Sequence, residues 1–205
     1  MIIGLDFDNT IVCYDQAILK LSQSIPDLPS SVSRTKLGLR DYLRSTGRES
    51  EWTAFQGTLY GPGMEHAEPF EGAVDTMLQM VADGHGLVII SHRSRHPYAG
   101  TPHDLHAAAR SWTAKRLQSL GLFLSTLDHA NAVNFLETRE EKIAMIGKLA
   151  CDVFVDDLPE VLNDEHFPSQ TMPVLFDPAR EHVAKDNTHP MNDWRHLPRI
   201  LADLA

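Results

Sequence analysis

Two pairs of acidic residues and one lysine carry the chemistry that this sequence indicates. Asp6 and Asp8 follow an apolar run at the N-terminus, and Asp156 and Asp157 follow a second run near the C-terminus. Lys142 lies near the start of a helix predicted just before that second run. Ligands of open α/β sheets bind outside the carboxyl ends of the strands, so these side chains should meet at one edge. Clustered carboxylates raise one another's pKa unless a cation neutralises them, and Mg²⁺ prefers oxygen ligands. The pattern predicts a Mg²⁺ site.

The elements that must position these residues alternate between short apolar runs and amphipathic segments, the pattern of an α/β protein with a mainly parallel sheet. Strands are expected at 1–7, 86–91, 132–136, 152–155 and 174–176, and helices at about 71–84, 101–121, 139–149 and from 193 onward. Thr101 and Pro102 mark the expected N-cap and first position of the second helix. Thr138 and Glu141 form a capping box at the start of the third, which places Lys142 in or beside its first turn.

The strand pattern stops after the first strand, where residues 13–68 indicate three helical segments separated by IPDLPSS and by Gly47. We therefore expect a catalytic core made of residues 1–12 and 69–205, interrupted by a helical insertion at 13–68. An insertion of about 55 residues is too small for an independent enzyme domain. It is large enough for a helical lid over the carboxyl edge of the sheet.

The composition and charge of the chain limit the kinds of binding partner that we expect. The chain has 205 residues, 42% of them hydrophobic, and its 18 basic against 28 acidic residues give a formal charge of −10. This charge disfavours a surface that binds duplex DNA or anionic lipid. No run reaches the roughly 18 apolar residues of a membrane span, and no signal peptide is indicated, so we expect a cytoplasmic protein. The two cysteines, Cys13 and Cys151, lack the spacing of a disulfide framework or zinc site.

The acidic pairs belong to an ordered set of four motifs. These are an apolar run followed by DFDNT, the segment VIIS, a lysine that opens a helix, and VFVDD. The set resembles the four motifs of the haloacid dehalogenase (HAD) superfamily of phosphotransferases. The resemblance implies a Rossmann-like core, and the insertion after the first motif is similar in position to the small C1-type cap of that superfamily.

The resemblance also implies roles for the motif residues. Asp6 would be the nucleophile that forms an aspartyl-phosphate, and Asp8 would be the general acid and base. Asp6 and Asp157 would bind Mg²⁺ together with the backbone carbonyl of Asp8. Asp156 would bind the metal directly or contact one of its ligands, and Asp157 is the favoured direct ligand of the two.

Two further motif residues, Ser91 and Lys142, would bind the transferring phosphoryl oxygens. A solvated lysine on a helix surface is the alternative for Lys142, with Lys115 and Lys148 as less well placed rivals. The second Asp of the first motif, Asp8, favours phosphate as the substrate group because a halide leaving group needs no proton.

Several further residues, Thr10 of the first motif among them, are candidate substrate ligands. Thr10 could orient the loop after the first strand, and Arg93 could bind a substrate anion through two parallel hydrogen bonds. Arg40 and Arg44 share a helix face of the insertion and could hold the distal part of the substrate, although a solvated face is the alternative. The histidine-rich segment 92–106 could face the substrate, bind zinc, or be an exposed loop.

The predicted function is Mg²⁺-dependent hydrolysis of a phosphomonoester on a small metabolite. The 14-residue step from Lys142 to Asp156, together with LFDP and DWRHL near the C-terminus, resembles 5′(3′)-deoxyribonucleotidase-like members. A nucleotide is therefore slightly favoured over a sugar phosphate. A non-catalytic phosphate-binding or regulatory protein of the same fold, or a receiver domain, is the alternative from another class. No stable nucleic-acid complex or membrane partner is expected, and the oligomeric state is left open.

Overall fold

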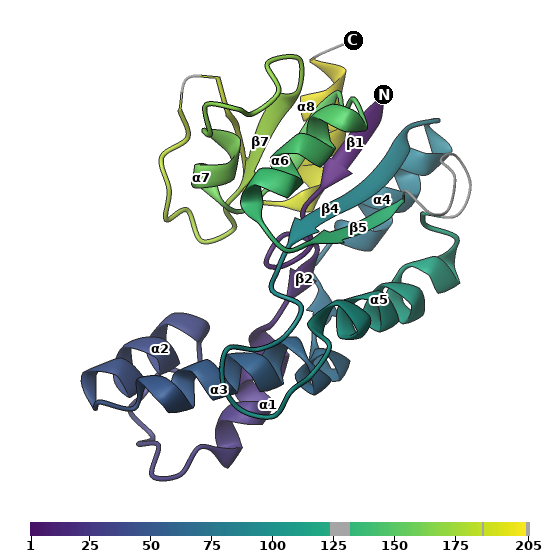
Figure 1. The fold of residues 1–205 in the computed structure, drawn as a ribbon. Coiled ribbons are helices and arrows are strands. Elements are labelled where there is room, and N and C mark those ends of the chain that lie inside the picture. The colour runs from purple at the N-terminus through teal and green to yellow at the C-terminus, as the bar shows by residue number, and fades with distance from the viewer. Residues whose placement is uncertain (124–131, 186, 204–205) are drawn as a thin grey trace. The chain divides into compact units, whose positions relative to one another are not determined.

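A six-stranded sheet organises the chain, whose computed structural model describes residues 1–123, 132–185 and 187–203 (Figure 1). The other residues of the predicted core, 124–131, 186 and 204–205, lie outside this description. The strand order is β5-β4-β1-β6-β7-β8, and neighbouring strands pair in parallel. The strands are β1 (Ile2–Leu5), β4 (Gly86–His92), β5 (Val133–Leu136), β6 (Val153–Asp156), β7 (Met172–Phe176) and β8 (His189–Met191). The predicted α/β class with a mainly parallel sheet is confirmed.

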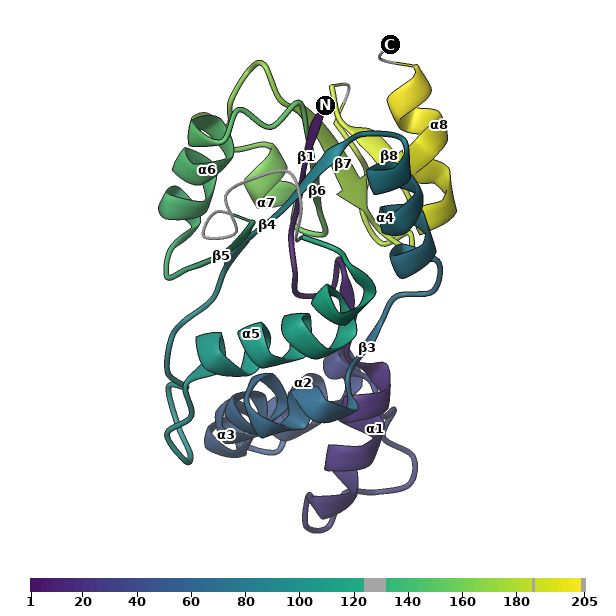
Figure 2. The same ribbon diagram turned by 90° about the vertical axis from the view of Figure 1, so that its right-hand side faces the viewer.

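The central strands are continuous apolar runs because helices cover both faces of the sheet. Figure 2 shows α6 (Arg139–Lys148) and α7 (Pro159–Leu162) on one side, and α4 (Ala73–Ala82) and α8 (Leu197–Ala202) on the other. Ile3 and Leu5 of β1 have no exposed surface, and the same holds for Val88 to Ile90 of β4. The amide of Ile2 donates to the carboxylate of Asp152 (2.6 Å), and this hydrogen bond joins the start of β1 to the residue before β6.

Local signals fix the helix that carries Lys142. Thr138 accepts a hydrogen bond from the Glu141 amide, and the Glu141 side chain accepts one from the Thr138 amide, so the predicted capping box is present. Gly84, after α4, takes the left-handed conformation expected of a residue that ends a helix (φ 85°).

A second compact unit comprises residues 13–68 and 94–114, and the remaining residues form the sheet unit. Its helices are α1 (Asp15–Leu21), α2 (Lys36–Ser45), α3 (Glu49–Tyr60) and most of α5 (Leu105–Arg116), with 3-10 turns η1 (Ser22–Ser24) and η2 (Pro62–His66). The strand and helix pattern of the sequence predicts 94–114 as part of the core instead. The segment belongs with the helices because Trp112 is buried there and its indole donates to the carbonyl of Ala67 (2.9 Å).

Some elements differ from those expected. The helix predicted from Thr101 begins at Leu105, since the Asp104 carboxylate accepts the hydrogen bond of the Ala107 amide and so caps it. Three short strands had no apolar run to predict them: β8 and the paired strands β2 (Val12–Cys13) and β3 (Glu68–Pro69). A 3-10 turn, η4 (Trp194–His196), precedes α8.

Within the described part of the chain, every helix is too short or too polar to cross a membrane.

Candidate active site

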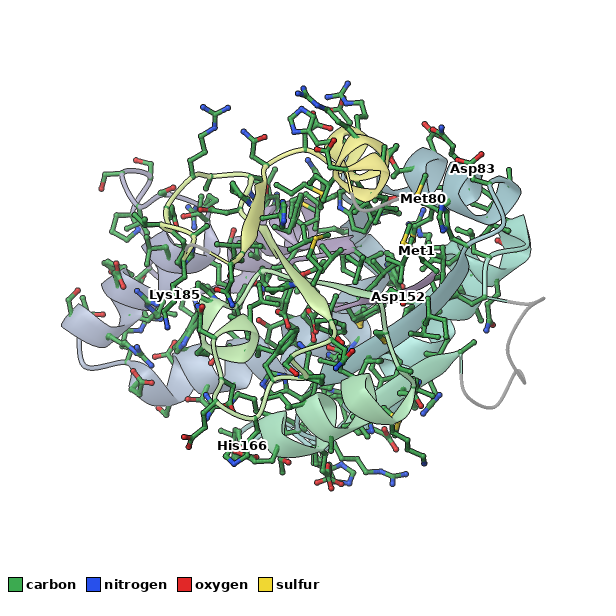
Figure 3. The ribbon with its side chains drawn as sticks, turned by 90° about the horizontal axis from the view of Figure 1, so that it is seen from above. Met1, Met80, Asp83, Asp152, His166 and Lys185 are labelled. Carbon is green, nitrogen blue, oxygen red and sulfur yellow. The ribbon has the colours of Figure 1, made fainter. Side chains whose placement is uncertain are left out.

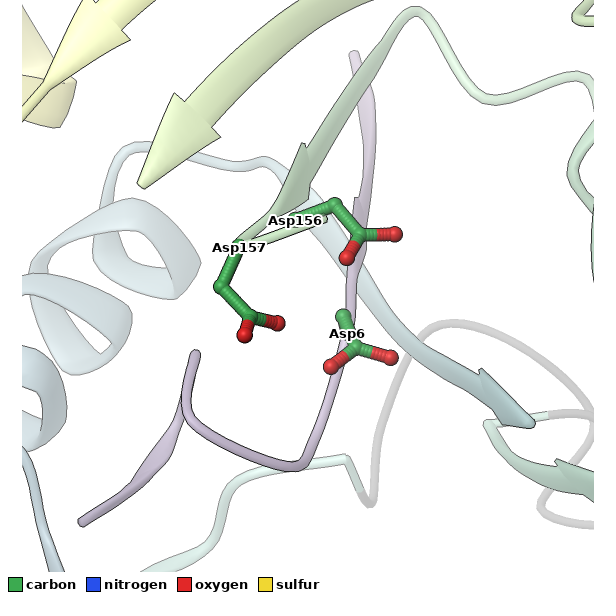
Figure 4. A group of neighbouring side chains, drawn as sticks. All are labelled: Asp6, Asp156 and Asp157. Atoms are coloured by element: carbon green, nitrogen blue, oxygen red, sulfur yellow. The ribbon is translucent and has the colours of Figure 1, made fainter. Parts of the chain in front are cut away.

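Three carboxylates meet at the carboxyl ends of β1 and β6. Asp6 directly follows β1, and its amide donates to the carbonyl of Val155 in β6 (2.8 Å). Asp156 ends β6, and Asp157 is the next residue. One oxygen from each of the three lies within 4.8 Å of the others (Figure 4). Parallel pairing of β1 with β6 therefore brings together residues that are 150 positions apart in the sequence.

Lys142 lies inside this acidic group. Its Nζ is 2.6 Å from Oδ1 of Asp6 and 2.7 Å from Oδ2 of Asp156, and its side chain has no exposed surface. The capping box sets where α6 begins, and Lys142 is the fourth residue of the helix. The alternative of a solvated helix lysine is wrong for Lys142.

Burial governs the electrostatics of the group. Burial raises the pKa of Asp156 to about 7, and the charge of Asp6 acts in the same direction against the opposing effect of Lys142. For Lys142, burial favours the neutral amine, but the charges of Asp156 and Asp6 outweigh it and raise the lysine pKa above its usual value. The Lys142 ammonium contacts Asp6 and Asp156 of this group of three carboxylates, and the remaining negative charge is one that a metal cation could neutralise.

The donor set fits a hard divalent cation. Asp6, Asp156 and Asp157 supply carboxylate oxygens, which Mg²⁺ and similar ions prefer. Among the described residues, this is the one group of His, Cys, Asp or Glu side chains that could hold a metal ion. The histidines of the 92–106 segment form no such group within the same described residues.

The turn after β1 presents the remaining residues of the first motif. Asn9 has a left-handed backbone (φ 57°), and the amides of Ile11 and Val12 both donate to the carbonyl of Phe7. The hydroxyl of Thr10 donates to Oδ1 of Asp157 (3.3 Å), so this buried threonine links the first motif to the acidic pair.

Trp194 supports this turn from the other end of the chain. Its buried indole N–H donates to the carbonyl of Thr10 (3.0 Å). Sequence reasoning missed this contact because 184 residues separate the partners and no local motif joins them.

Ser91 occupies the carboxyl end of β4, beside β1 in the sheet. The residue is 1% exposed, and its hydroxyl has no hydrogen-bond partner among the described residues. Buried polar groups are normally paired, so an unpartnered hydroxyl is suited to a ligand that supplies the missing partner.

Asp8 and Arg93 form a separate ion pair. Nη1 of Arg93 is 3.5 Å from Oδ1 of Asp8, and Asp8 does not belong to the group of three carboxylates. Arg93 was predicted to bind a substrate anion, and the structure gives it an acidic partner within the protein. Substrate binding by Arg93 stays a prediction.

Arg40 and Arg44 lie on α2 of the helical unit. Arg40 pairs with Asp41 (3.0 Å) and Arg44 with Glu49 (2.7 Å), and the side chains of both arginines are more than 40% exposed. The structure therefore gives these arginines solvated ion pairs, and their predicted contact with substrate stays a prediction.

Comparisons with known proteins address the fold. No family model matches the chain, and no curated protein matches its sequence. Solved structures similar to it include a predicted phosphatase from Clostridium acetobutylicum (11% identity, 98% of each chain covered, TM-score 0.62). YfnB from Bacillus subtilis, described as a putative HAD-hydrolase and bound to magnesium, is similar at 15% identity, with 98% of this chain and 97% of that one covered and a TM-score of 0.62. A HAD-superfamily hydrolase of subfamily IA from Geobacter sulfurreducens is similar at 14% identity, with 98% and 95% covered and a TM-score of 0.57.

The parallel sheet and the acidic group at its carboxyl edge define an α/β protein with a site suited to a divalent metal ion. The similarity to the three solved structures identifies this fold as that of the haloacid dehalogenase superfamily.

Proposed function

We propose that this chain is a metal-dependent phosphomonoester hydrolase in which Asp6 is the nucleophile. The observation that carries the proposal is the buried contact of Lys142 with Asp6 and Asp156, next to Asp157 at the carboxyl ends of β1 and β6. Buried charged groups with perturbed pKa values are typical of functional sites. The hydrolases and the predicted phosphatase that share the fold support the same reaction class.

In the first half of the reaction, a carboxylate oxygen of Asp6 attacks phosphorus as the bond from phosphorus to the ester oxygen breaks. The carboxyl group of Asp8 gives its proton to that leaving oxygen, which departs as an alcohol. The products of this step are an aspartyl-phosphate at Asp6 and a carboxylate at Asp8.

In the second half, water attacks phosphorus and gives a proton to the Asp8 carboxylate. The bond from phosphorus to Asp6 breaks, which releases inorganic phosphate and restores the Asp6 carboxylate and the Asp8 carboxyl. The sum is one ester and one water converted to one alcohol and one phosphate.

The residues that would hold Mg²⁺ are Asp6, Asp156 and Asp157, with the backbone carbonyl of Asp8 as a further ligand. When bound, the ion would supply positive charge to the phosphoryl oxygens and to the clustered carboxylates. Lys142 would contribute a further fixed positive charge beside Asp6. The Ser91 hydroxyl would donate to a phosphoryl oxygen.

The substrate would be a small phosphorylated metabolite, with a nucleotide slightly favoured over a sugar phosphate. Residues 13–68 would act as a helical cap that shields the reaction from water, as insertions after the first motif do in this superfamily. Thr10 would orient the loop, and Arg40 and Arg44 would contact the distal part of the substrate. We place the protein in the cytoplasm, with no nucleic-acid or membrane partner.

The test is release of phosphate from nucleoside monophosphates, sugar phosphates and p-nitrophenyl phosphate, with Mg²⁺ and with EDTA. We expect release that needs Mg²⁺ and falls by at least about a thousandfold in Asp6→Asn, since the nucleophile would be lost. The matched control is Asp83→Asn, because Asp83 is an exposed acid at the end of α4, away from the sheet's carboxyl edge (Figure 3).

Two outcomes would contradict the proposal. If Asp6→Asn keeps more than about a tenth of the wild-type rate, Asp6 is not the nucleophile. A tenfold loss of rate corresponds to only about 1.4 kcal/mol of activation free energy. Folded, Mg²⁺-binding protein that releases no phosphate across the panel would favour the non-catalytic binding role.

A further inference from the structure

Arg93 is a buried arginine at the carboxyl end of β4. It follows the last residue of β4, and its amide donates to the carbonyl of Leu136 in β5 (2.8 Å), so its backbone extends the sheet pairing. Only 6% of its side-chain surface is exposed. Burying a guanidinium is costly unless a partner compensates it, so its surroundings indicate what it does.

Those surroundings come from the first motif. The guanidinium carbon lies 5.9 Å from the ring centre of Phe7, within the range of a cation–π contact. Phe7 is itself held edge-on by Phe135 of β5, with ring centres 5.0 Å apart. The guanidinium thus lies over an aromatic ring that is buried in the core.

The same guanidinium contacts Asp8. Its Nη1 lies 3.5 Å from Oδ1 of Asp8, whose side chain is 20% exposed. Asp8 lies beyond β1, where it forms an isolated β-bridge with Val12 next to the left-handed Asn9. That bridge pairs the backbone of Asp8 and does not by itself orient its carboxyl group. The ion pair therefore places Oδ1 of Asp8 beside a buried cation whose backbone continues the sheet pairing.

We propose that Arg93 is a positioning residue that holds the Asp8 carboxyl group in the orientation needed for proton transfer to the leaving oxygen. The proposal rests on the proposed hydrolase function, in which Asp8 gives that proton. General acid catalysis needs the donor within hydrogen-bond reach of the leaving oxygen, and a misoriented carboxyl group would fail this requirement. Arg93 acts through Asp8 here, whereas the prediction from sequence has it bind the substrate directly.

The experiment compares two esters of nearly the same shape, phenyl phosphate and p-nitrophenyl phosphate. Phenolate needs a proton as it leaves, and p-nitrophenolate leaves without one. The measured quantity is kcat/KM for each ester, because it covers the steps up to loss of the leaving group. The variants are Arg93→Gln and Arg93→Lys. Arg95→Gln is the matched control, since Arg95 is exposed and pairs with Asp104 in the helical unit.

We expect Arg93→Gln to lower kcat/KM for phenyl phosphate at least about tenfold more than for p-nitrophenyl phosphate. Arg93→Lys, which keeps the charge, should recover part of that difference, and Arg95→Gln should leave the ratio of the two values unchanged. Thermal unfolding of each variant separates this effect from loss of the fold.

An equal loss of kcat/KM for both esters would overturn the proposal, because a residue that binds the phosphoryl group or supports the fold would affect both alike. An unchanged ratio in Arg93→Gln with normal activity would overturn it as well. A wild-type protein that cleaves neither ester would instead contradict the proposed function on which the proposal rests.

Discussion

Ion pairs of similar length occur in two regions of this molecule with very different surroundings. In the sheet unit, Lys142 contacts Asp6 at 2.6 Å and Asp156 at 2.7 Å with no exposed side-chain surface on the lysine. On the helical unit, Arg44 contacts Glu49 at 2.7 Å, and about half of each side chain is exposed. Arg48 and Glu51 make a similar pair at 2.6 Å on the same unit.

The distance between two charged groups therefore does not indicate how much their ion pair contributes to stability or function. Exposed pairs are screened by water and contribute little to stability. Buried pairs lose hydration, so Coulomb attraction inside the protein offsets a large desolvation cost. A buried pair is therefore weak evidence for stability and better evidence for a site, since it holds charges in fixed places. The predictions below test that difference, beginning with the largest expected effect.

Removing the lysine from the buried group should give the largest change in stability. Lys142→Met leaves Asp6 and Asp156 buried together without their cation. We expect the free energy of unfolding, measured in urea without metal, to be about 3–5 kcal/mol lower than that of wild type. Lys148→Met is the control, because Lys148 is exposed on the same helix. Similar losses in both variants would contradict the role assigned to burial.

Stability should depend on pH through Asp156. Burial raises its pKa to about 7 in the folded protein, whereas the ordinary aspartate value in an unfolded chain is about 3.9. Between these values the folded state holds a proton that the unfolded state has lost. This contribution is therefore fully present below about pH 4 and disappears as pH rises through about 7.

The check is the free energy of unfolding across that pH range in EDTA, for wild type and for Asp156→Asn. We expect the variant to lose less stability than wild type as pH rises, since its amide does not titrate. Parallel pH profiles for the two proteins would contradict the raised pKa of Asp156. Asp83→Asn should follow the wild-type profile.

Metal binding should stabilise the folded state by a smaller amount. An ion that binds only the folded protein adds about 2.7 kcal/mol at a hundred times its dissociation constant. We expect Mg²⁺ to raise the thermal midpoint of wild type, and to raise that of Asp157→Asn much less, because one carboxylate of the group is removed. An equal rise of the thermal midpoint in both proteins would show that Asp157 is not a ligand of the metal.

Neutralising the exposed pairs should have the smallest effect. The double variant Arg40→Gln and Arg44→Gln should unfold at nearly the same urea concentration as wild type, because both side chains are solvated. Its KM tests the predicted contact with substrate: it should rise for the best physiological ester in the panel and stay constant for p-nitrophenyl phosphate. A marked fall in the urea midpoint would contradict the small contribution of these exposed ion pairs to stability.

Much of the sheet could be predicted from the sequence because its central strands are buried on both faces and read as uninterrupted apolar runs. Lys142 was located by the capping box of Thr138 and Glu141, a signal contained within four residues. β8 was missed because its three residues, His189–Met191, include a proline and present no apolar run.

The parts that sequence could not supply depend on contacts between distant residues. The hydrogen bond from Thr10 to Asp157 and the ion pair of Arg93 with Asp8 arise only once the strands have paired. The assignment of 94–114 to the helical unit depends likewise on the buried contact of Trp112 with Ala67. The hydrophobic periodicity of a helix predicts that one of its faces is buried. It does not predict which of the two units that face packs in.

The most direct test of the account is to trap the covalent intermediate. Wild-type protein would be mixed with the best substrate and Mg²⁺, quenched in acid within the first turnovers, digested, and searched by mass spectrometry for a phosphorylated peptide. We expect an acid-stable, base-labile phosphoryl group on the peptide that contains Asp6, and no such group in Asp6→Asn. A phosphoryl group on another residue, or turnover with no covalent phosphate on any peptide, would contradict it.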